Sequence, residues 1–126
     1  MADIEHDKFT YGFVEGQASI ELAELVYVES NLHRCLFHFA NKTVLSAYQK
    51  LDDIEALIAD ARLLRIHKSY LVNMDFCAKV SNYQLWLRSG QSFSVPRIRY
   101  HYVKECFLKH QLQKQTTRYP HANTIL

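Results

Sequence analysis

The sequence predicts a mostly-β domain of short antiparallel strands, with one acidic helix in the interior of the chain and a short helix near its C-terminus. Apolar and polar residues alternate in several short segments, and turn-forming residues separate these segments. The alternation changes to a helical period in only two places. The chain has 126 residues, of which 48% are hydrophobic, so it is long enough to bury one core without disulfides. A single domain without internal repeats is expected.

Most of the predicted strands lie in the first half of the chain. The segment Leu25-Val26-Tyr27-Val28 is the firmest of them, because its residues are mostly β-branched or aromatic. Residues 29–32 interrupt the strand pattern, and Asn41-Lys42 predicts a hairpin turn. The strands expected in this half are residues 9–14, 18–20, 25–28, 33–39 and 43–45.

A helical period replaces the alternation at residues 51–58. The acidic side chains Asp52, Asp53 and Glu55 fall early in this segment, where the helix dipole favours anions. The apolar stripe expected to face the core consists of Leu51, Ile54, Leu57, Ile58 and Ala61.

Residues 64–73 combine core anchors with hydrogen-bond donors. Leucine, isoleucine and valine side chains alternate with Arg65, His67, Lys68 and Ser69, whose donors suit phosphates and base edges. We expect a strand that runs into a tight turn, which the side-chain oxygen of Asn73 is able to close. The alternative is a strand end whose charges are merely solvated.

The second half predicts three further strands and a helix. Strands are expected at residues 76–80, 84–88 and 93–95, with turns at Asn82-Tyr83 and Ser89-Gly90-Gln91. Pro96 suits the first position of a helix. Its expected apolar stripe is Ile98, Tyr102, Cys106 and Phe107. The predicted organisation is an N-terminal extension (1–8), a domain (9–110) and a polar, frayed C-terminal tail (111–126).

Charge is distributed unevenly along the chain. Residues 1–61 carry four Lys/Arg against eleven Asp/Glu, a net charge of −7, whereas residues 62–126 carry eleven against two, a net charge of +9. The basic half predicts a polyanionic partner, unless the two halves neutralise each other in the fold. No apolar run reaches the ~18 residues of a membrane span. The acidic start lacks the features of a signal peptide, so a cytoplasmic protein without a membrane partner is expected.

The sequence gives little reason to expect catalysis, a cofactor or a metal. His67 and Ser69 share a strand face, but no neighbouring acid would orient the imidazole. The glycines lie far apart, so no phosphate-binding loop is expected, and no spacing of Cys or His suits zinc. Buried free thiols are expected at Cys35, Cys77 and Cys106.

Two further segments carry side chains that suit an anionic partner. His33 and Arg34 follow the interruption at residues 29–32, which places both at a loop edge, whereas His38 is expected to be a solvated strand residue. Arg97 and Arg99 lie in one turn at a helix start. The macrodipole disfavours cations there by ~0.3–1 kcal/mol, and an anionic partner would offset this cost. Ordinary solvated turns are the alternative.

Together these segments resemble the LytTR family of bacterial DNA-binding domains. The resemblance is carried by Leu25-Val26-Tyr27-Val28-Glu29, by residues 64–73, and by Ser89-Gly90 and Ser94-Val95-Pro96-Arg97. It covers most of the chain, from Phe9 to Phe107. It implies an elongated β fold and a sequence-specific transcription regulator that inserts loops into successive major grooves of double-stranded DNA.

The resemblance also implies which residues contact DNA. In the first loop the matching histidine is His33, followed by Arg34. Lys68 follows the histidine of the central block, and Arg97 ends the strand-to-helix motif. The predicted DNA-binding residues are His33, Arg34, His67, Lys68, Ser69, Arg97 and Arg99. Lys68 stands where the family often has Arg or Asn, and Pro96 stands where it usually has Ser, so a shifted sequence preference is expected.

Three alternatives remain open. The first is a protein-interaction module that titrates partner regulators, and the second is a thiol or ligand sensor that works through the cysteines. The third is RNA binding, which the core-like spacing of the aromatic residues disfavours. Most LytTR proteins carry an upstream receiver domain, for which this chain has no room, so we expect a free-standing regulator or an excised domain. Two copies on repeated half-sites are expected by analogy with other small DNA-binding domains.

Overall fold

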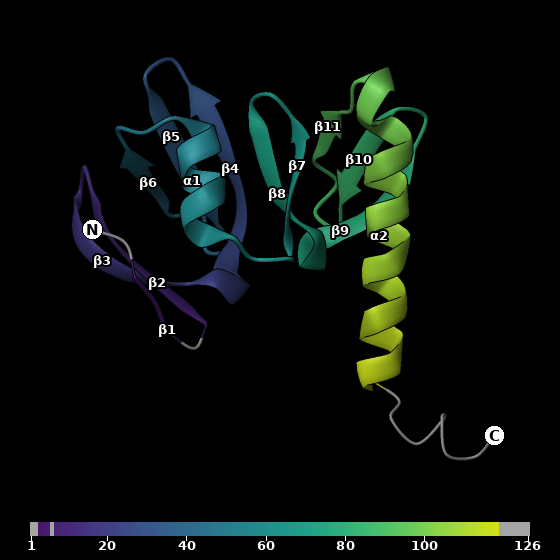
Figure 1. The fold of residues 1–126 in the computed structure, drawn as a ribbon, viewed down its shortest axis with the longest axis horizontal. Coiled ribbons are helices and arrows are strands. Elements are labelled where there is room, and N and C mark those ends of the chain that lie inside the picture. The colour runs from purple at the N-terminus through teal and green to yellow at the C-terminus, as the bar shows by residue number, and fades with distance from the viewer. Residues whose placement is uncertain (1–2, 6, 119–126) are drawn as a thin grey trace. The chain divides into compact units, whose positions relative to one another are not determined.

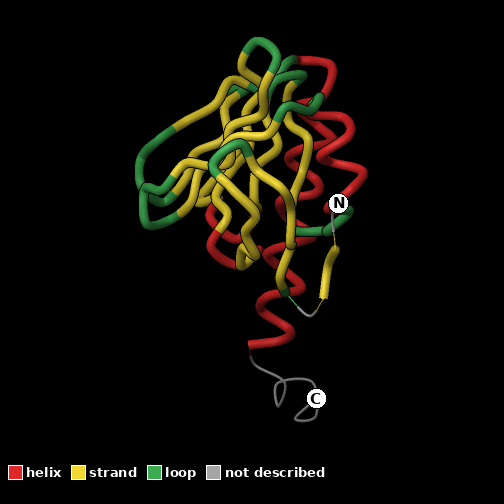
Figure 2. Tube along the Cα trace, turned by 90° about the vertical axis from the view of Figure 1, so that its left-hand side faces the viewer, coloured by secondary structure: helices red, strands yellow, loops and turns green. Residues whose placement is uncertain are grey.

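The computed structural model describes residues 3–5 and 7–118, with side chains described for residues 7–114. The described residues form eleven strands, two α-helices and two short 3-10 turns (Figure 1). Figure 2 shows that strands make up most of the chain outside the helices, which confirms the predicted mostly-β class. The chain divides after Phe76 into two compact units.

The first unit contains two antiparallel sheets. One has the order β1-β2-β3 and consists of β1 (Asp3–Glu5), β2 (Lys8–Phe13) and β3 (Gly16–Glu21). The other has the order β6-β5-β4-β8-β7 and consists of β4 (Leu25–Asn31), β5 (Arg34–Phe39), β6 (Val44–Ala47), β7 (Leu63–His67) and β8 (Tyr70–Asn73). Strand β1 lies in the segment predicted as an extension. Strand β4 continues to Asn31. The prediction that residues 29–32 interrupt the strand was therefore wrong.

Helix α1 (Leu51–Ile58) covers one face of the five-stranded sheet, where it packs against β4 and β8 (Figure 1). Leu51, Ile54 and Ile58 are buried as predicted, but Leu57 is 40% exposed. The helix ends because Ala59 adopts a left-handed backbone (φ 46°). Ala61 therefore lies outside the helix, and its predicted place on the stripe was wrong.

The central segment forms a hairpin, and its tight turn is at Lys68-Ser69, between β7 and β8. The prediction of a single strand that runs up to a turn at Asn73 was wrong, because the segment forms two paired strands. Asn73 instead ends β8, where its Oδ1 accepts a hydrogen bond from the backbone N–H of Asp75 (2.9 Å). The side-chain oxygen of Asn73 thus closes a turn as predicted. This turn follows β8 and is not the turn between β7 and β8.

The second unit consists of a three-stranded antiparallel sheet and helix α2 (Arg97–Arg118), which packs against β9. The sheet has the order β11-β10-β9 and contains β9 (Cys77–Ser81), β10 (Gln84–Leu87) and β11 (Ser92–Ser94). Asn82 and Tyr83 both have positive φ (52° and 60°), as the two-residue turn of a hairpin requires. The predicted turns at Asn82-Tyr83 and Gly90 are therefore confirmed.

Helix α2 differs from its prediction in length and in orientation. It continues past Gln111 to Arg118, so the predicted tail begins inside the helix; residues 119–126 lie outside the described residues. The buried side chains are Tyr100, Val103 and Phe107, whereas Ile98 is 94% exposed. Within the described part of the chain, neither helix is both long and apolar enough to cross a membrane.

Candidate nucleic-acid interface

The hairpin between β4 and β5 presents the first pair of predicted DNA-binding residues. Its tip is Leu32-His33, and Leu32 has a left-handed backbone (φ 59°) and a relative exposure of 91%. This conformation is uncommon for a residue other than glycine, and it gives the strands a tight connection. His33 and Arg34 are both exposed. Their side chains are therefore accessible to a partner at this end of the sheet.

The hairpin between β7 and β8 presents the second group. Strand β7 is irregular between Arg65 and His67, and the Ser69 amide donates a hydrogen bond to Nδ1 of His67 (3.0 Å). Because Nδ1 is the acceptor, Nε2 is the ring nitrogen that can donate to a partner. His67 is half-buried and its ring lies 5.5 Å from that of Tyr70, whereas Lys68 is exposed.

A backbone hydrogen bond joins these two hairpins. The Ser30 amide donates to the Ser69 carbonyl (2.9 Å), and Glu29 pairs with Tyr70 in the sheet, so both hairpins lie at the same end. The structure thus brings together the predicted residues His33, Arg34, His67, Lys68 and Ser69.

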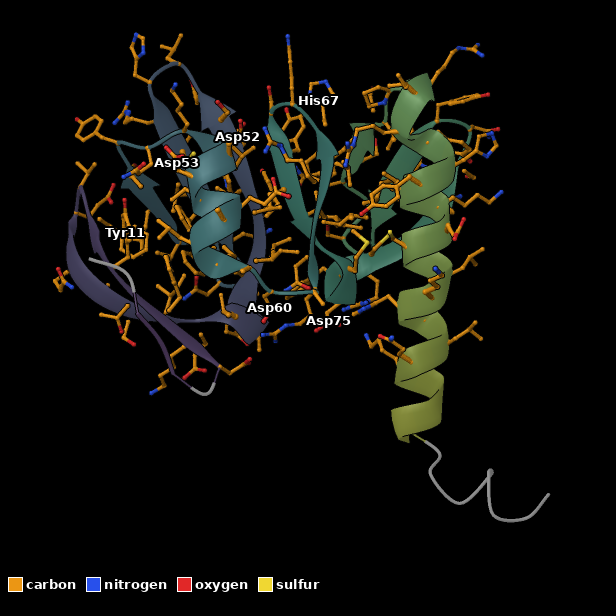
Figure 3. The ribbon with its side chains drawn as sticks, in the orientation of Figure 1. Tyr11, Asp52, Asp53, Asp60, His67 and Asp75 are labelled. Carbon is orange, nitrogen blue, oxygen red and sulfur yellow. The ribbon has the colours of Figure 1, made fainter. Side chains whose placement is uncertain are left out.

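An open cleft of about 600 Å³ adjoins the two hairpins and the start of α1. Figure 3 shows His67, Asp52 and Asp53 near this end of the first unit. The cleft is lined by Ser30, Leu32, His33, Tyr48, Gln49, Lys50, Leu51, Asp52, Asp53, Arg65 and Lys68. Its lining carries charges of both signs: Asp52 and Asp53 are acidic, and Lys50, Arg65 and Lys68 are basic.

Arg65 directs its guanidinium at other groups of the protein, whereas Lys68 is exposed. Its nitrogens donate to the backbone carbonyls of His67 and Lys68 and to the carboxylates of Asp52 and Glu55. The expectation that Arg65 belongs to the outward donors of this segment is therefore wrong. The sequence contained no signal for these contacts, because the two acids lie on a helix ten and more residues away.

The third group, Arg97 and Arg99, lies in the second unit at the start of α2. The Val95 amide donates to the Tyr83 carbonyl (2.9 Å), which fastens the segment before α2 to the β9–β10 turn. The Arg97 guanidinium lies 4.8 Å from the ring centroid of Tyr83, and that of Arg99 lies 5.4 Å from the ring of Tyr102. Both arginines thus have a defined aromatic neighbour.

His38 is not the solvated strand residue that the alternation predicted. Its Nε2 lies 2.7 Å from Oε1 of Glu29, and its ring stacks on Tyr27 with a centroid distance of 4.2 Å and an interplanar angle of 10°. Cross-strand neighbours on β4 therefore hold this histidine in place, and it lies outside the group of exposed donors.

Arg62 supports the first unit from the end of α1. It bonds to Asp60, at Nε–Oδ1 (3.0 Å), and to Asp7. Hydrogen bonds from this guanidinium lower the pKa of the Asp60 carboxyl, and the two acids raise the pKa of Arg62. This side chain is used inside the protein and is not a candidate for DNA contact.

The cysteines are free thiols that differ in burial. The part of the chain that the structure describes contains no group of three or more potential metal ligands. All three cysteines are free, with Cys35 and Cys77 buried and Cys106 half-buried. Burial raises the pKa of Cys35 to about 11 and that of Cys77 to about 12.

We expect a thiol reagent at pH 8 to label at most Cys106 in the native protein. The thiolate is the reactive form, and burial disfavours it at Cys35 and Cys77. Labelling followed by mass spectrometry should find these two residues modified only after unfolding. Rapid native modification of Cys35 or Cys77 would instead favour the thiol-sensor alternative.

Comparisons with known proteins bear on the family and the fold of this chain. The family model described as the LytTr DNA-binding domain matches residues 15–108. A solved structure described as the LytTr DNA-binding domain of a methyl-accepting/DNA response regulator from Bacillus cereus has a TM-score of 0.66. It is 15% identical, and the similarity covers 81% of this chain and 97% of that one. The search of curated proteins finds no significant match. The match to the family model spans most of the sequence, and the chain therefore belongs to the LytTR family of DNA-binding domains.

Proposed function

We propose that this protein is a sequence-specific transcription regulator that contacts duplex DNA through the β4–β5 hairpin, the β7–β8 hairpin and the start of α2. The main support is the hydrogen bond from the Ser30 amide to the Ser69 carbonyl (2.9 Å), which keeps two donor-bearing hairpins together. Imidazole, ammonium and hydroxyl groups at such tips suit both phosphates and base edges.

The donors are expected to divide into two roles. Lys68 and Arg34 are exposed cations and suit phosphate neutralisation, which supplies most of the affinity. Arg97 has a planar fork that matches the O6 and N7 acceptors of guanine, and His33 is the candidate for a base contact in the first hairpin.

We further propose that two copies bind repeated half-sites in the cytoplasm. One small domain contacts few base pairs, and two copies on the same face of the duplex extend the recognised sequence. Selection of bound duplexes from a random pool tests both proposals, because it reveals a preferred sequence and any repeat of ~10–10.5 bp. A pool that shows no enrichment would contradict sequence-specific binding.

Salt dependence tests whether phosphate contacts dominate the affinity. If roughly five phosphates are neutralised, the logarithm of the binding constant should fall with the logarithm of salt concentration at a slope near −4.5. A flat dependence would count against a specific regulator. The absence of a mobility shift on any duplex, together with co-purification of another regulator, would favour the protein-interaction module.

Arg97 and Arg99 should respond differently to substitution. Arg97→Ala should weaken binding to the selected duplex by ~1–3 kcal/mol and relax the preference at one base pair, because a bidentate base contact is lost. Arg99→Ala should weaken all duplexes about equally and make the salt slope shallower by about one unit, as expected of a phosphate contact. Titrations of specific and unrelated duplexes at several salt concentrations measure both effects.

The two variants are matched controls for each other, since each removes one guanidinium beside an aromatic ring. Arg97 is exposed and Arg99 is half-buried. Both variants should melt close to the wild-type temperature, because a cation–π contact at an exposed site stabilises by only ~0.5–1 kcal/mol. If Arg97→Ala weakens specific and non-specific binding by the same factor, Arg97 contacts no base and its assignment is wrong.

A further inference from the structure

The side chain of Arg65 connects the β7–β8 hairpin to helix α1. On the hairpin side, Nε donates to the carbonyl oxygen of His67 (2.8 Å) and Nη2 donates to that of Lys68 (2.6 Å). His67 ends β7 and Lys68 begins the turn, so these carbonyls belong to the two peptide groups on either side of Lys68. The guanidinium therefore binds the backbone both before and after Lys68. The turn is thereby restrained where Lys68 leaves the strand.

On the helix side, the guanidinium meets two carboxylates. Nη1 donates to Oδ1 of Asp52 (2.7 Å) and to Oε1 of Glu55 (2.9 Å), and the Arg65 side chain is only 16% exposed. The two acids lie one turn apart on α1, so they face the same guanidinium. An arginine surrounded in this way already directs its donors at protein acceptors, and its charge is compensated locally.

We propose that Arg65 is a positioning residue for DNA recognition and not a DNA ligand. It holds the β7–β8 hairpin in the shape that presents His67, Lys68 and Ser69, and the acidic pair Asp52 and Glu55 holds Arg65 itself. Helix α1 thus contributes to DNA recognition indirectly, through Asp52 and Glu55, although its acidic start would repel a phosphate. This inference rests on the proposed function of the hairpin. It adds that Arg65, held by Asp52 and Glu55, orients the hairpin.

The planar fork of arginine is essential to this role. Arg65 uses Nε, Nη1 and Nη2 in fixed directions toward three sets of acceptors, whereas a lysine ammonium is a compact point charge. Lysine at this position would keep the charge but could not restrain both carbonyls and both carboxylates. Arg65→Lys therefore removes the positioning hydrogen bonds but keeps the positive charge, so it tests the two contributions separately.

The first test needs no DNA. Hydrogen exchange at the amides of Ser69 and Ser30 reports on the hairpin, because these amides donate to His67 Nδ1 and to the Ser69 carbonyl. Arg65→Lys and Asp52→Ala should both exchange faster than wild type at these two amides. Arg88→Lys, the same change in the exposed β10–β11 turn, should leave them unchanged. Wild-type protection in Arg65→Lys would overturn the proposal.

The second test measures the ratio of specific to non-specific binding constants on the duplex that wild type selects. Arg65→Lys should lower this ratio roughly tenfold, within the range of one lost base contact, with an unchanged salt slope. A phosphate ligand would behave differently: Arg65→Lys would keep the ratio, and Arg65→Ala would make the slope shallower by about one unit. That second result would overturn the positioning role.

For Asp52→Ala, electrostatics and positioning predict opposite changes in DNA binding. Removing a carboxylate from this region should, by electrostatics alone, strengthen binding to every duplex. Positioning instead predicts that specific binding falls relative to non-specific binding, and a uniform gain would count against the proposal. If wild type itself prefers no duplex, the proposed function fails, and the exchange test still decides whether Arg65 holds the hairpin.

Discussion

Replacing Phe37 with alanine should lower the free energy of unfolding by about 3–5 kcal/mol, the range observed for large aromatic deletions in well-packed cores. Phe37 is fully buried in β5. Its ring meets that of Phe13, on β2 of the other sheet, with centroids 5.1 Å apart and an interplanar angle of 82°. This edge-to-face pair joins the two sheets of the first unit, so the substitution leaves a cavity at their junction.

Urea denaturation followed by circular dichroism measures this effect as a lower midpoint with an unchanged slope. Leu36→Ala is the matched control, because Leu36 is the neighbouring strand residue on the opposite, half-buried face. Leu36→Ala should lower the free energy of unfolding by clearly less than Phe37→Ala does. Equal losses for the two variants would show that the junction of the sheets is not the principal core contact.

Asn73→Ala should destabilise the protein by about 2–4 kcal/mol, because buried groups that lose a hydrogen-bond partner cost ~1–3 kcal/mol each. Asn73 is a fully buried polar residue. Its Nδ2 donates to the carbonyls of Leu25 (2.8 Å) and Leu22 (3.3 Å), and its Oδ1 accepts from the Asp75 amide (2.9 Å). Thermal and urea unfolding of the variant measure the loss.

The control is Asn41→Ala, which also removes an amide that caps a turn. Asn41 is exposed, and its Oδ1 accepts from the Thr43 amide (2.9 Å). Water can replace this partner, so the loss should stay well below that of Asn73→Ala. A similar loss at both positions would mean that local turn formation, and not the bonds to Leu22 and Leu25, gives Asn73 its importance.

Most of the strands were predictable because their signals are local. The alternation in β5 places Cys35, Phe37 and Phe39 inward, and the burial of these three residues confirms it. The hairpin turns at Asn41-Lys42 and Asn82-Tyr83 were predictable because each contains an asparagine, a common turn residue. Positive φ occurs at Lys42, Asn82 and Tyr83. The orientation of α2 was not, because Ile98 and Tyr102 repeat at the same helical spacing as the buried Tyr100, Val103 and Phe107.

The candidate site was predictable as residue types but not as a set of contacts. The donors His33, Arg34, Lys68 and Ser69 stand next to turn signals, and the structure puts them on two joined hairpins. The partners of Arg65 lie ten and thirteen residues away on a helix, and no spacing rule links a strand arginine to such acids. Similarly, the Oδ1 contact of Asn73 is local and was anticipated, whereas its Nδ2 bonds reach residues about fifty positions earlier.

The central place of β4 in the five-stranded sheet determines when in folding the two hairpins of the proposed DNA-binding surface can come together. Strand β4 pairs with β5, which follows it directly, but also with β8, where Tyr27 stands opposite Val72. The first pairing is local, whereas the second must close a loop of more than forty residues, so we expect the second to form later. During synthesis the chain therefore exposes the His33 hairpin long before β8 arrives. Only that late pairing sets Lys68 beside it, so a partly made protein lacks the combined surface that we propose for DNA binding, and it is expected to bind DNA more weakly than the finished protein.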